Sequence, residues 1–143
     1  MTGKYLIMPF SEKYRKPVIE LWEKCGLFYP GNDPDTDIDI KMKFQPELFF
    51  IGMSGERVVS TLMAGFDGHR GWLNYLGVHP DFRKKGYAGS IVSYAMEKLR
   101  ELGCPKLNLQ VRNSNTGVIE FYKRLGFYHH DVTSMQIKLS DNS

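Results

Sequence analysis

The chain has 143 residues, of which 42% are hydrophobic and 24% charged, and its formal net charge is +3. This composition fits a single globular domain over residues 1–143 and excludes a disordered or fibrous protein. The small net charge argues against a general nucleic-acid binder, so we expect no nucleic-acid partner. The longest apolar run, near Leu48 to Ile51, is too short to cross a bilayer, and no basic-then-apolar leader is visible. We therefore expect a cytoplasmic protein without a membrane partner.

The spacing of the two cysteines, Cys25 and Cys104, does not suggest a metal-ligand pair. Without a leader, free thiols are expected rather than a disulfide. We expect no metal site.

A helix is predicted between a short apolar opening at Tyr5–Phe10 and Gly26, a residue type favoured just after a helix. Ser11 and Pro17 both qualify as its start, because serine caps helices and proline is tolerated in the first turn. The residues that recur at helical spacing are Val18, Leu21, Trp22 and Cys25.

The segment Asp37–Phe44 is ambiguous. It follows Tyr29–Asp39, which is rich in Pro, Gly, Asn and Asp and is typical of a loop. Its apolar residues alternate as in a strand, whereas Thr36 with Asp39 three residues later resembles a capping box that starts a helix.

The rest of the chain alternates between strand and helix patterns. The expected strands are 48–53, 57–66, 72–78, 107–111 and a final strand over 132–139, and the expected helices are 88–102 and 115–126. The first three of these strands form an antiparallel meander, and the strand–helix–strand unit from Trp72 to Val111 makes its two strands parallel neighbours. We therefore expect an α+β fold with a mixed, mostly antiparallel sheet.

The junction before the helix at 88–102 is a candidate anion site. The first N–H groups of a helix have no intrahelical partner, Gly86 lets the backbone approach closely, and Arg83, Lys84 and Lys85 add charge. The junction lacks the patterns of nucleotide triphosphatases and dehydrogenases. The alternative is an ordinary solvated basic turn.

Two motifs together resemble the GNAT family of N-acetyltransferases. Arg83-x-x-Gly86-x-Ala88 matches its Gln/Arg-x-x-Gly-x-Gly/Ala signature and follows a strand that ends in Val78-His79-Pro80. Asn115-Thr116-Gly117-Val118-Ile119-Glu120-Phe121-Tyr122-Lys123-Arg124-Leu125-Gly126-Phe127 is similar to its C-terminal pattern. The order of elements agrees along the whole chain. Within the family, Asn32-Asp33-Pro34, the turn Asp67-Gly68-His69-Arg70-Gly71 and Gly103-Cys104-Pro105-Lys106 look most like the bacterial YpeA-like branch.

The resemblance implies a three-layer αβα fold whose sheet splays at the central parallel strand pair, with acetyl-CoA as co-substrate. Backbone groups of Lys84–Gly89 would bind the cofactor pyrophosphate, and Leu76–Val78 would run beside the pantetheine arm. An N–H at or near Val78 would stabilise the oxyanion. Core packing is the alternative role of Leu76 and Val78. The implied cofactor-binding residues are Leu76, Gly77, Val78, Arg83, Lys84, Lys85, Gly86, Tyr87, Ala88, Gly89 and Asn115.

Tyr122 takes the position at which many family members have a tyrosine that protonates the departing thiolate, and it is the implied catalytic residue. An ordinary tyrosine pKa of about 10 keeps it a proton donor at neutral pH. The alternative is a core tyrosine. Asn115 would cap its helix, hydrogen-bond the cofactor arm, or do both.

The general base stays open. Related ribosomal-protein acetyltransferases have a Glu at the position of Gln110, and an amide cannot take the proton. His79 has a suitable intrinsic pKa, but a His-Pro pair is common at this place in the family. The remaining options are Tyr75, Asp33, Asp35, Asp37 or a water chain.

The acidic loop with Asp33, Asp35, Asp37 and Asp39 lies where family members line the acceptor side. Its charge favours a cationic acceptor such as a polyamine, a peptide amine or an amino sugar, and turn and cap chemistry is the alternative. We therefore expect an acetyl-CoA-dependent N-acetyltransferase acting on a small cationic amine or a peptide amine. A non-catalytic acyl-CoA-binding protein is the alternative, and a homodimer is a further expectation.

Overall fold

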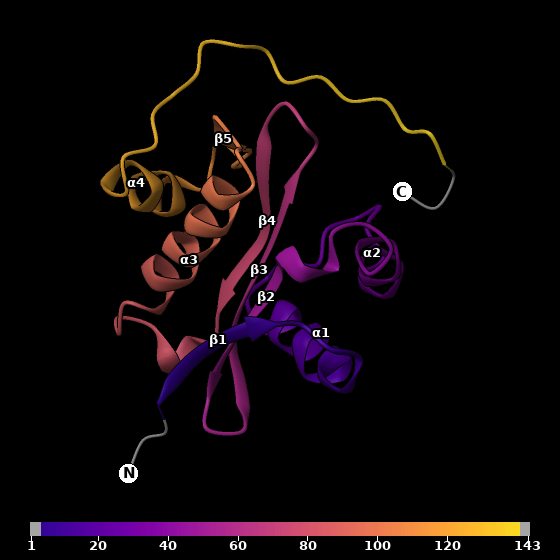
Figure 1. Cartoon of the computed structure of the whole chain (residues 1–143), viewed down its shortest axis with the longest axis vertical. Helices are drawn as coiled ribbons and strands as arrows, with labels where there is room; N and C mark the ends of the chain where they lie inside the picture. Colours follow the sequence, from indigo (N-terminus) through magenta and orange to yellow (C-terminus); the bar gives the residue numbers. More distant parts are fainter. Residues whose placement is uncertain (1–3, 141–143) are drawn as a thin grey trace.

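A computed structural model describes residues 4–140 and shows one five-stranded sheet with helices on both faces (Figure 1). The strands are β1 (Tyr5–Pro9), β2 (Phe49–Ser54), β3 (Arg57–Phe66), β4 (Gly71–Val78) and β5 (Leu107–Leu109). They follow one another across the sheet in chain order, antiparallel except for the parallel β4–β5 pair. The mixed α+β architecture is therefore confirmed.

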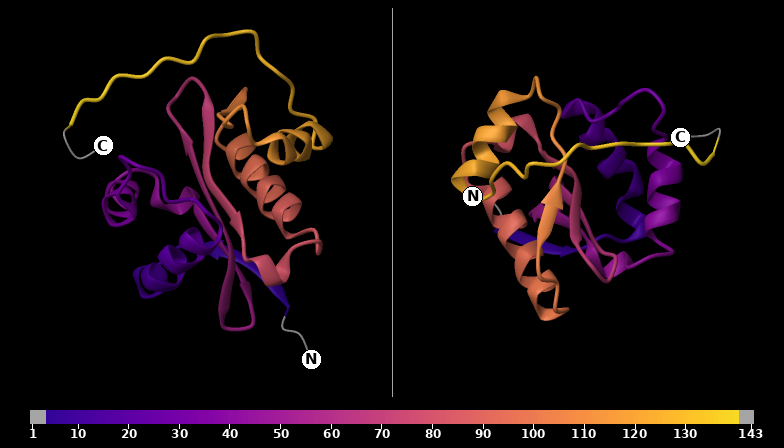
Figure 2. Two further views of the ribbon diagram at one scale, coloured as in Figure 1. Left: turned by 180° about the vertical axis from the view of Figure 1, so that it is seen from behind. Right: turned by 90° about the horizontal axis from the view of Figure 1, so that it is seen from above.

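Two helices cover each face of the sheet, which makes the three predicted layers (Figures 1 and 2). α1 and α2 pack on one face around buried Trp22 and Ile38, and α3 and α4 pack on the other around Ile91 and Tyr122. The helices are α1 (Arg15–Lys24), α2 (Pro34–Lys41), α3 (Tyr87–Glu101) and α4 (Thr116–Arg124), and short 3-10 turns cover Glu12–Tyr14, Pro46–Leu48 and Pro80–Phe82.

Of the two candidate start signals of the first helix, Pro17 lies in the first turn of α1, which begins at Arg15 after Tyr14. Proline is tolerated there because the first N–H groups of a helix have no intrahelical partner. Ser11 instead precedes the 3-10 turn at Glu12–Tyr14, and its side chain makes no capping hydrogen bond.

The ambiguous segment is helical and begins earlier than either alternative placed it. Asp33 is the N-cap of α2, and its carboxylate accepts hydrogen bonds from the backbone N–H of Asp35 (3.2 Å) and from Thr36 Oγ1 (2.7 Å). Pro34 then takes the first helical position, which suits its fixed φ. The alternation was misleading because Ile38 is buried and Ile40 is exposed.

The final strand predicted over 132–139 is wrong. The described part of the tail, residues 128–140, pairs with no strand and runs away from α4 past the β3–β4 hairpin (Figure 1). Its alternating side chains Met135, Ile137 and Leu139 are exposed. A strand needs a ladder partner, and within the described residues the tail forms none.

No helix between residues 4 and 140 combines the length and the apolar character needed to cross a membrane. Cys25 and Cys104 are both free and half-buried.

Candidate active site

β4 and β5 pair only at the beginning of β4. Gly71–Leu73 pairs with Leu107–Leu109, while β4 continues to Val78. From Asn74 onward, the edge of β4 that faces β5 has no strand partner in the described chain. The sheet is thus split at its parallel pair, and the free backbone groups of this edge can bond an extended ligand arm as an added strand would.

A β-bulge bends β4 at this split. Tyr75 and Leu76 face one residue of β3, Leu62, and Tyr75 has a left-handed φ of 56°. Such a conformation costs an aromatic residue roughly 1–3 kcal/mol and persists only where the surroundings hold it. Thr61 Oγ1 donates to the Tyr75 carbonyl (3.0 Å) and accepts from Trp22 Nε1 (3.0 Å), and the two aromatic rings stack with centroids 3.8 Å apart. Tyr75 is therefore fixed before any ligand binds.

The turn between β4 and α3 presents a row of open backbone N–H groups. Lys84 and Gly86 both have left-handed φ values, 64° and 81°, and no side chain caps α3. In the described chain, no N–H from Lys84 to Gly89 donates to a protein acceptor. A Cβ built on Gly89 meets no atom within 4 Å. These residues fit the phosphates of a CoA, because concave N–H groups at a helix N-terminus bind anions.

Side chains around this turn brace it. Arg83 Nε donates to the Val78 carbonyl (3.1 Å), which ties the turn to the end of β4. The Tyr87 ring stacks on Tyr5 with centroids 3.9 Å apart, and Tyr5 Oη is hydrogen-bonded to Ser60 Oγ (2.8 Å). The turn and the first residue of α3 are therefore held by side chains, and the backbone N–H groups stay open.

Gly77 has a packing role. A Cβ at Gly77 would lie 3.1 Å from both Cys25 Sγ and Leu27 Cδ1, so a larger residue would push these two side chains, which follow α1, away by a few tenths of an ångström. Whether its backbone also contacts the cofactor stays a prediction.

Tyr122 is 7% exposed and belongs to the same apolar cluster as Leu73 and Leu109, the last residue pair before the sheet splits. Its ring packs edge-on against Phe127, with centroids 5.2 Å apart. Burial raises the pKa of Tyr122 well above its ordinary value, and no hydrogen bond contributes to the shift. The phenol is thus a protonated donor next to the split. Its catalytic role stays a prediction.

Asn115 is confirmed as the cap of α4, with its Oδ1 accepting from the Val118 N–H at 3.4 Å. Its predicted bond to the cofactor arm remains a prediction.

The acidic loop is largely engaged within the protein. Arg15 of α1 binds the carboxylates of Asp35 (3.1 Å) and Asp39 (2.7 Å), and Asp33 caps α2. Only Asp37 is directed to β4, where its Oδ2 accepts from Tyr75 Oη at 2.5 Å. Burial first, and then Asp37, raise the pKa of Tyr75.

A cavity of about 330 Å³ lies between α2 and the β3–β4 pair. The sequence did not single out its most unusual residue, Lys41, which is 7% exposed and donates from Nζ to the Ala64 carbonyl (2.5 Å). Burial lowers the pKa of Lys41 to about 8. The lining residues are Asn32, Asp37, Ile40, Lys41, Phe44, Met63, Asn74 and Tyr75.

His79, another candidate for the base, is placed elsewhere. Its Nδ1 accepts from the Asp81 N–H (3.1 Å) and caps a 3-10 turn, and desolvation lowers its pKa. Gln110, which cannot act as a base, donates to Ser134 Oγ in the tail. Of the groups proposed from the sequence, only Asp37 and Tyr75 therefore line the cavity.

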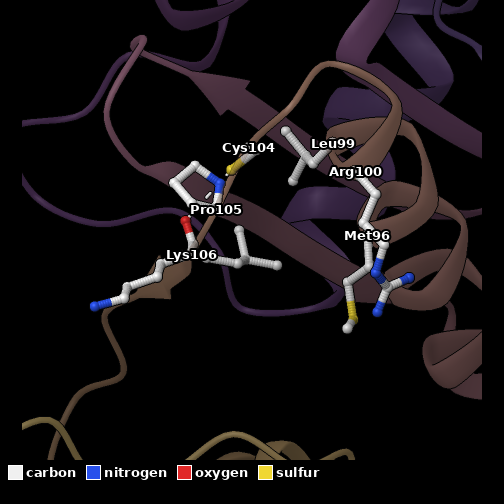
Figure 3. A pocket seen from close by; sticks show the side chains of 7 residues that line it. Met96, Leu99, Arg100, Cys104, Pro105 and Lys106 are labelled. Carbon is white, nitrogen blue, oxygen red and sulfur yellow. Dashed lines mark hydrogen bonds between the residues drawn. The ribbon is translucent and has the colours of Figure 1, made fainter.

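A second, smaller cavity of about 170 Å³ lies at the C-terminal end of α3 (Figure 3). With about 1.5 Å per residue, the fifteen-residue helix separates this cavity from the N–H row by roughly 20 Å. This smaller cavity is therefore remote from the split, and we assign it no function. The residues around it are Met96, Leu99, Arg100, Cys104, Pro105, Lys106 and Leu107.

Within residues 4–140, no group of three His, Cys, Asp or Glu is placed to hold a metal ion.

The split sheet and the open N–H row that follows it are the parts of a transferase that uses a CoA thioester. Comparison with known proteins agrees. The profile of the "Acetyltransferase (GNAT) family" matches residues 15–127. Acetyltransferase YE1169 of Yersinia enterocolitica is 43% identical over 133 residues, which cover 93% of this chain and 94% of that protein.

Solved structures share the fold. Ard1 from Thermoplasma volcanium has a TM-score of 0.79 and 22% identity, over 87% of this chain and 82% of that one. The aminoglycoside N-acetyltransferase AAC(6')-Iy in complex with CoA has a TM-score of 0.77 and 17% identity, over 96% and 97%. The chain belongs to the GNAT family of acetyltransferases. It is an acyltransferase with acetyl-CoA as its co-substrate.

Proposed function

We propose that the enzyme transfers the acetyl group of acetyl-CoA to a small primary amine by direct attack in a ternary complex. The observation that carries this proposal is that β4 is accessible from two sides. Its edge is free where β5 separates from it, and Tyr75 at its bulge lines the cavity under α2. The thioester and the amine can thus meet at one strand, and positioning of two reactants supplies a large part of the rate.

The backbone performs most of the binding in this proposal. The N–H groups of Lys84–Gly89 hold the pyrophosphate, and the free edge over Leu76–Val78 bonds the amide groups of the pantetheine arm. A backbone N–H at Val78 polarises the thioester carbonyl as the amine attacks.

Tyr122 and Asp37 handle the protons. The acceptor reacts as the neutral amine, so its ammonium form first loses one proton to water. Attack then forms the C–N bond and breaks the C–S bond, the sulfur takes a proton from Tyr122 Oη, and the nitrogen gives its excess proton to the Asp37 carboxylate. Tyr75 keeps its own proton and donates it to Asp37 Oδ2, since burial and Asp37 raise the pKa of Tyr75. Burial raises the pKa of Tyr122, and a CoA thiol held in the same apolar surroundings would have a raised pKa for the same reason. The pKa difference between the proton donor and the departing thiolate then changes little.

Release of free thiol from acetyl-CoA with a panel of amines tests the proposal. Tyr122→Phe should lower kcat at least tenfold and leave CoA binding, measured by thermal shift, unchanged. Tyr128→Phe is the matched control, since Tyr128 is exposed beyond α4. Loss of both binding and turnover in Tyr122→Phe would assign Tyr122 to the core, and CoA binding without turnover on any amine would favour a non-catalytic acyl-CoA-binding protein.

We also propose a homodimer in which the tail of one copy pairs with β5 of the other. Two segments of the described chain support this proposal, because each has an edge without a neighbouring strand. β5 pairs with β4 alone, and the tail is an unpaired extended segment along which exposed Met135, Ile137 and Leu139 alternate. Light scattering should give twice the mass of the chain, and a chain ending at residue 131 should be monomeric.

We propose the cytoplasm as its compartment. Two free thiols in the described chain agree with a reducing environment. A functional fluorescent fusion would show the location.

A further inference from the structure

Helix α2 carries two opposite charges one turn apart that do not pair with each other. Asp37 and Lys41 stand in an i,i+4 relation, a spacing at which oppositely charged side chains usually interact. No ion pair joins them in the described chain: Asp37 bonds Tyr75 Oη, and Lys41 bonds the Ala64 carbonyl. Both line the cavity under α2.

Lys41 has donors to spare. An ammonium group has three, and the protein satisfies one of them, through Ala64. The neighbouring amide of Gln45 is already engaged in both directions with the backbone of Phe66, at 2.7 and 2.8 Å. No carboxylate of residues 4–140 lies within ion-pair distance of Lys41 Nζ, and Glu47 acts on it only from farther away. Lys41 therefore gives the cavity lining a buried positive charge suited to an anionic group of the ligand.

Asp37 has an acceptor to spare. Tyr75 donates to its Oδ2, and no protein donor in the described chain reaches its Oδ1. The free carboxylate oxygen and the Tyr75 hydroxyl together suit a primary ammonium group. Asp37 and Tyr75 are therefore complementary to the amine of the acceptor.

The apolar lining and the volume of the cavity indicate the size and polarity of the remainder of the ligand. Ile40, Phe44 and Met63 line the cavity, and its volume of about 330 Å³ is at the lower end for ligand sites. Such a space suits a molecule of amino-acid size with an apolar side chain.

We propose that the acceptor is a free amino acid with an apolar side chain. Its amine bonds Asp37 and Tyr75, its carboxylate bonds Lys41, and its side chain packs against Phe44 and Ile40. This inference rests on the proposed acetyl transfer and narrows its acceptor from amines in general to those with a carboxylate.

Three matched substrates test it with the intact enzyme: L-leucine, L-leucinamide, which lacks the carboxylate charge, and isoamylamine, which lacks the carboxyl carbon. Thiol release from acetyl-CoA should give a kcat/KM for L-leucine about 10- to 100-fold above the other two, the range expected for loss of one charge-assisted hydrogen bond. Equal values, or a preference for isoamylamine or putrescine, would overturn the proposal and leave acetyl transfer standing.

The variant Lys41→Met should remove the preference. It should lower kcat/KM for L-leucine about 10- to 100-fold and leave the value for isoamylamine within about threefold. Lys43→Met is the control, because Lys43 is exposed and does not line the cavity. An unchanged preference in a folded Lys41→Met enzyme would refute the role of Lys41. If that variant fails to fold, the comparison of the three substrates on the unaltered enzyme decides.

Calorimetry of L-leucine binding to the enzyme–CoA complex separates the two levels of the proposal. Leucine binding that is lost in Lys41→Met would support the amino-acid site. If such binding occurred without acetyl transfer, the proposed function alone would be refuted. Absence of leucine binding combined with turnover of uncharged amines would refute the site alone.

Discussion

Replacing Thr61 by valine probes the support under the bulge of β4. The Thr61 side chain is fully buried, and its hydroxyl accepts from Trp22 Nε1 and donates to the Tyr75 carbonyl, both at 3.0 Å. Valine has nearly the same shape, so Thr61→Val removes both hydrogen bonds and leaves the packing in place.

The expected loss of stability is about 3 kcal/mol, within a range of about 1–5 kcal/mol. A buried donor or acceptor left without a partner costs roughly 1–3 kcal/mol, and here the Trp22 N–H and the Tyr75 carbonyl are both affected. The extra methyl group returns about 1 kcal/mol. Thr61→Ser keeps the hydroxyl and loses a methyl group, so it should cost only about 1 kcal/mol.

Urea unfolding followed by Trp fluorescence measures both variants. The same enzymes should show a raised KM for the amine in Thr61→Val, because Tyr75 is no longer held at the cavity, and an unchanged Kd for CoA. If Thr61→Val were as stable as Thr61→Ser to within about 0.5 kcal/mol, the hydroxyl would not be what holds the bulge.

Three further outcomes are expected. Gly89→Ala should raise the stability of α3 by about 0.5–1 kcal/mol, since the new Cβ meets open space, yet raise the Kd for CoA at least tenfold. Ser93→Ala, on the exposed side of the same helix, should leave that Kd unchanged. Equal Kd values for the two variants in calorimetry would contradict the proposed phosphate position. Burial lowers the pKa of Lys41 from 10.5 to about 8, so between these pH values the unfolded chain binds more protons than the folded one. The stability of the wild type relative to Lys41→Met should therefore rise by up to roughly 3 kcal/mol from pH 8 to pH 10.5. A stability difference that stays constant with pH in urea unfolding would contradict this expectation. Asp33→Ala should cost about 1 kcal/mol through loss of the α2 cap, and a loss below about 0.3 kcal/mol would show that the cap is dispensable.

The parts of the fold that were predicted well are those whose apolar residues follow a pattern that fits only one kind of element. The meander strands are short, mostly apolar runs bounded by turn residues, and α3 repeats its apolar residues at three- and four-residue steps, so local pattern and tertiary packing agree. Segments whose pattern has two meanings were not predicted. α2 alternates like a strand, but the cap at Asp33 and Pro34 sets a helix. The tail also alternates, but a strand requires a partner that no local pattern can supply.

The same distinction applies to the site. The turn from Arg83 to Gly89 is continuous in sequence, so its residue types alone were enough to predict an anion site there. The cavity under α2 is assembled from α2, β3 and β4, and its Asp37–Tyr75 bond spans 38 residues. Lys41 in particular carried no sequence signal, because lysine is normally exposed and only tertiary structure shows it buried.

The acidic residues of α2 divide by face, and this division explains how the cavity obtains its charges. Successive helical residues are about 100° apart, so the pair Asp35 and Asp39 lies roughly opposite the pair Asp37 and Lys41. Arg15 holds the first pair and also donates to the Asp35 carbonyl (3.2 Å), which fixes the rotation of α2 about its axis. A helix fixed in this rotation must direct Asp37 and Lys41 to β3 and β4. Asp33, Asp35 and Asp39, which suggest an attractive wall for cations in the sequence, are therefore engaged in capping and orienting α2, and the proposed acceptor site has one carboxylate and one ammonium group.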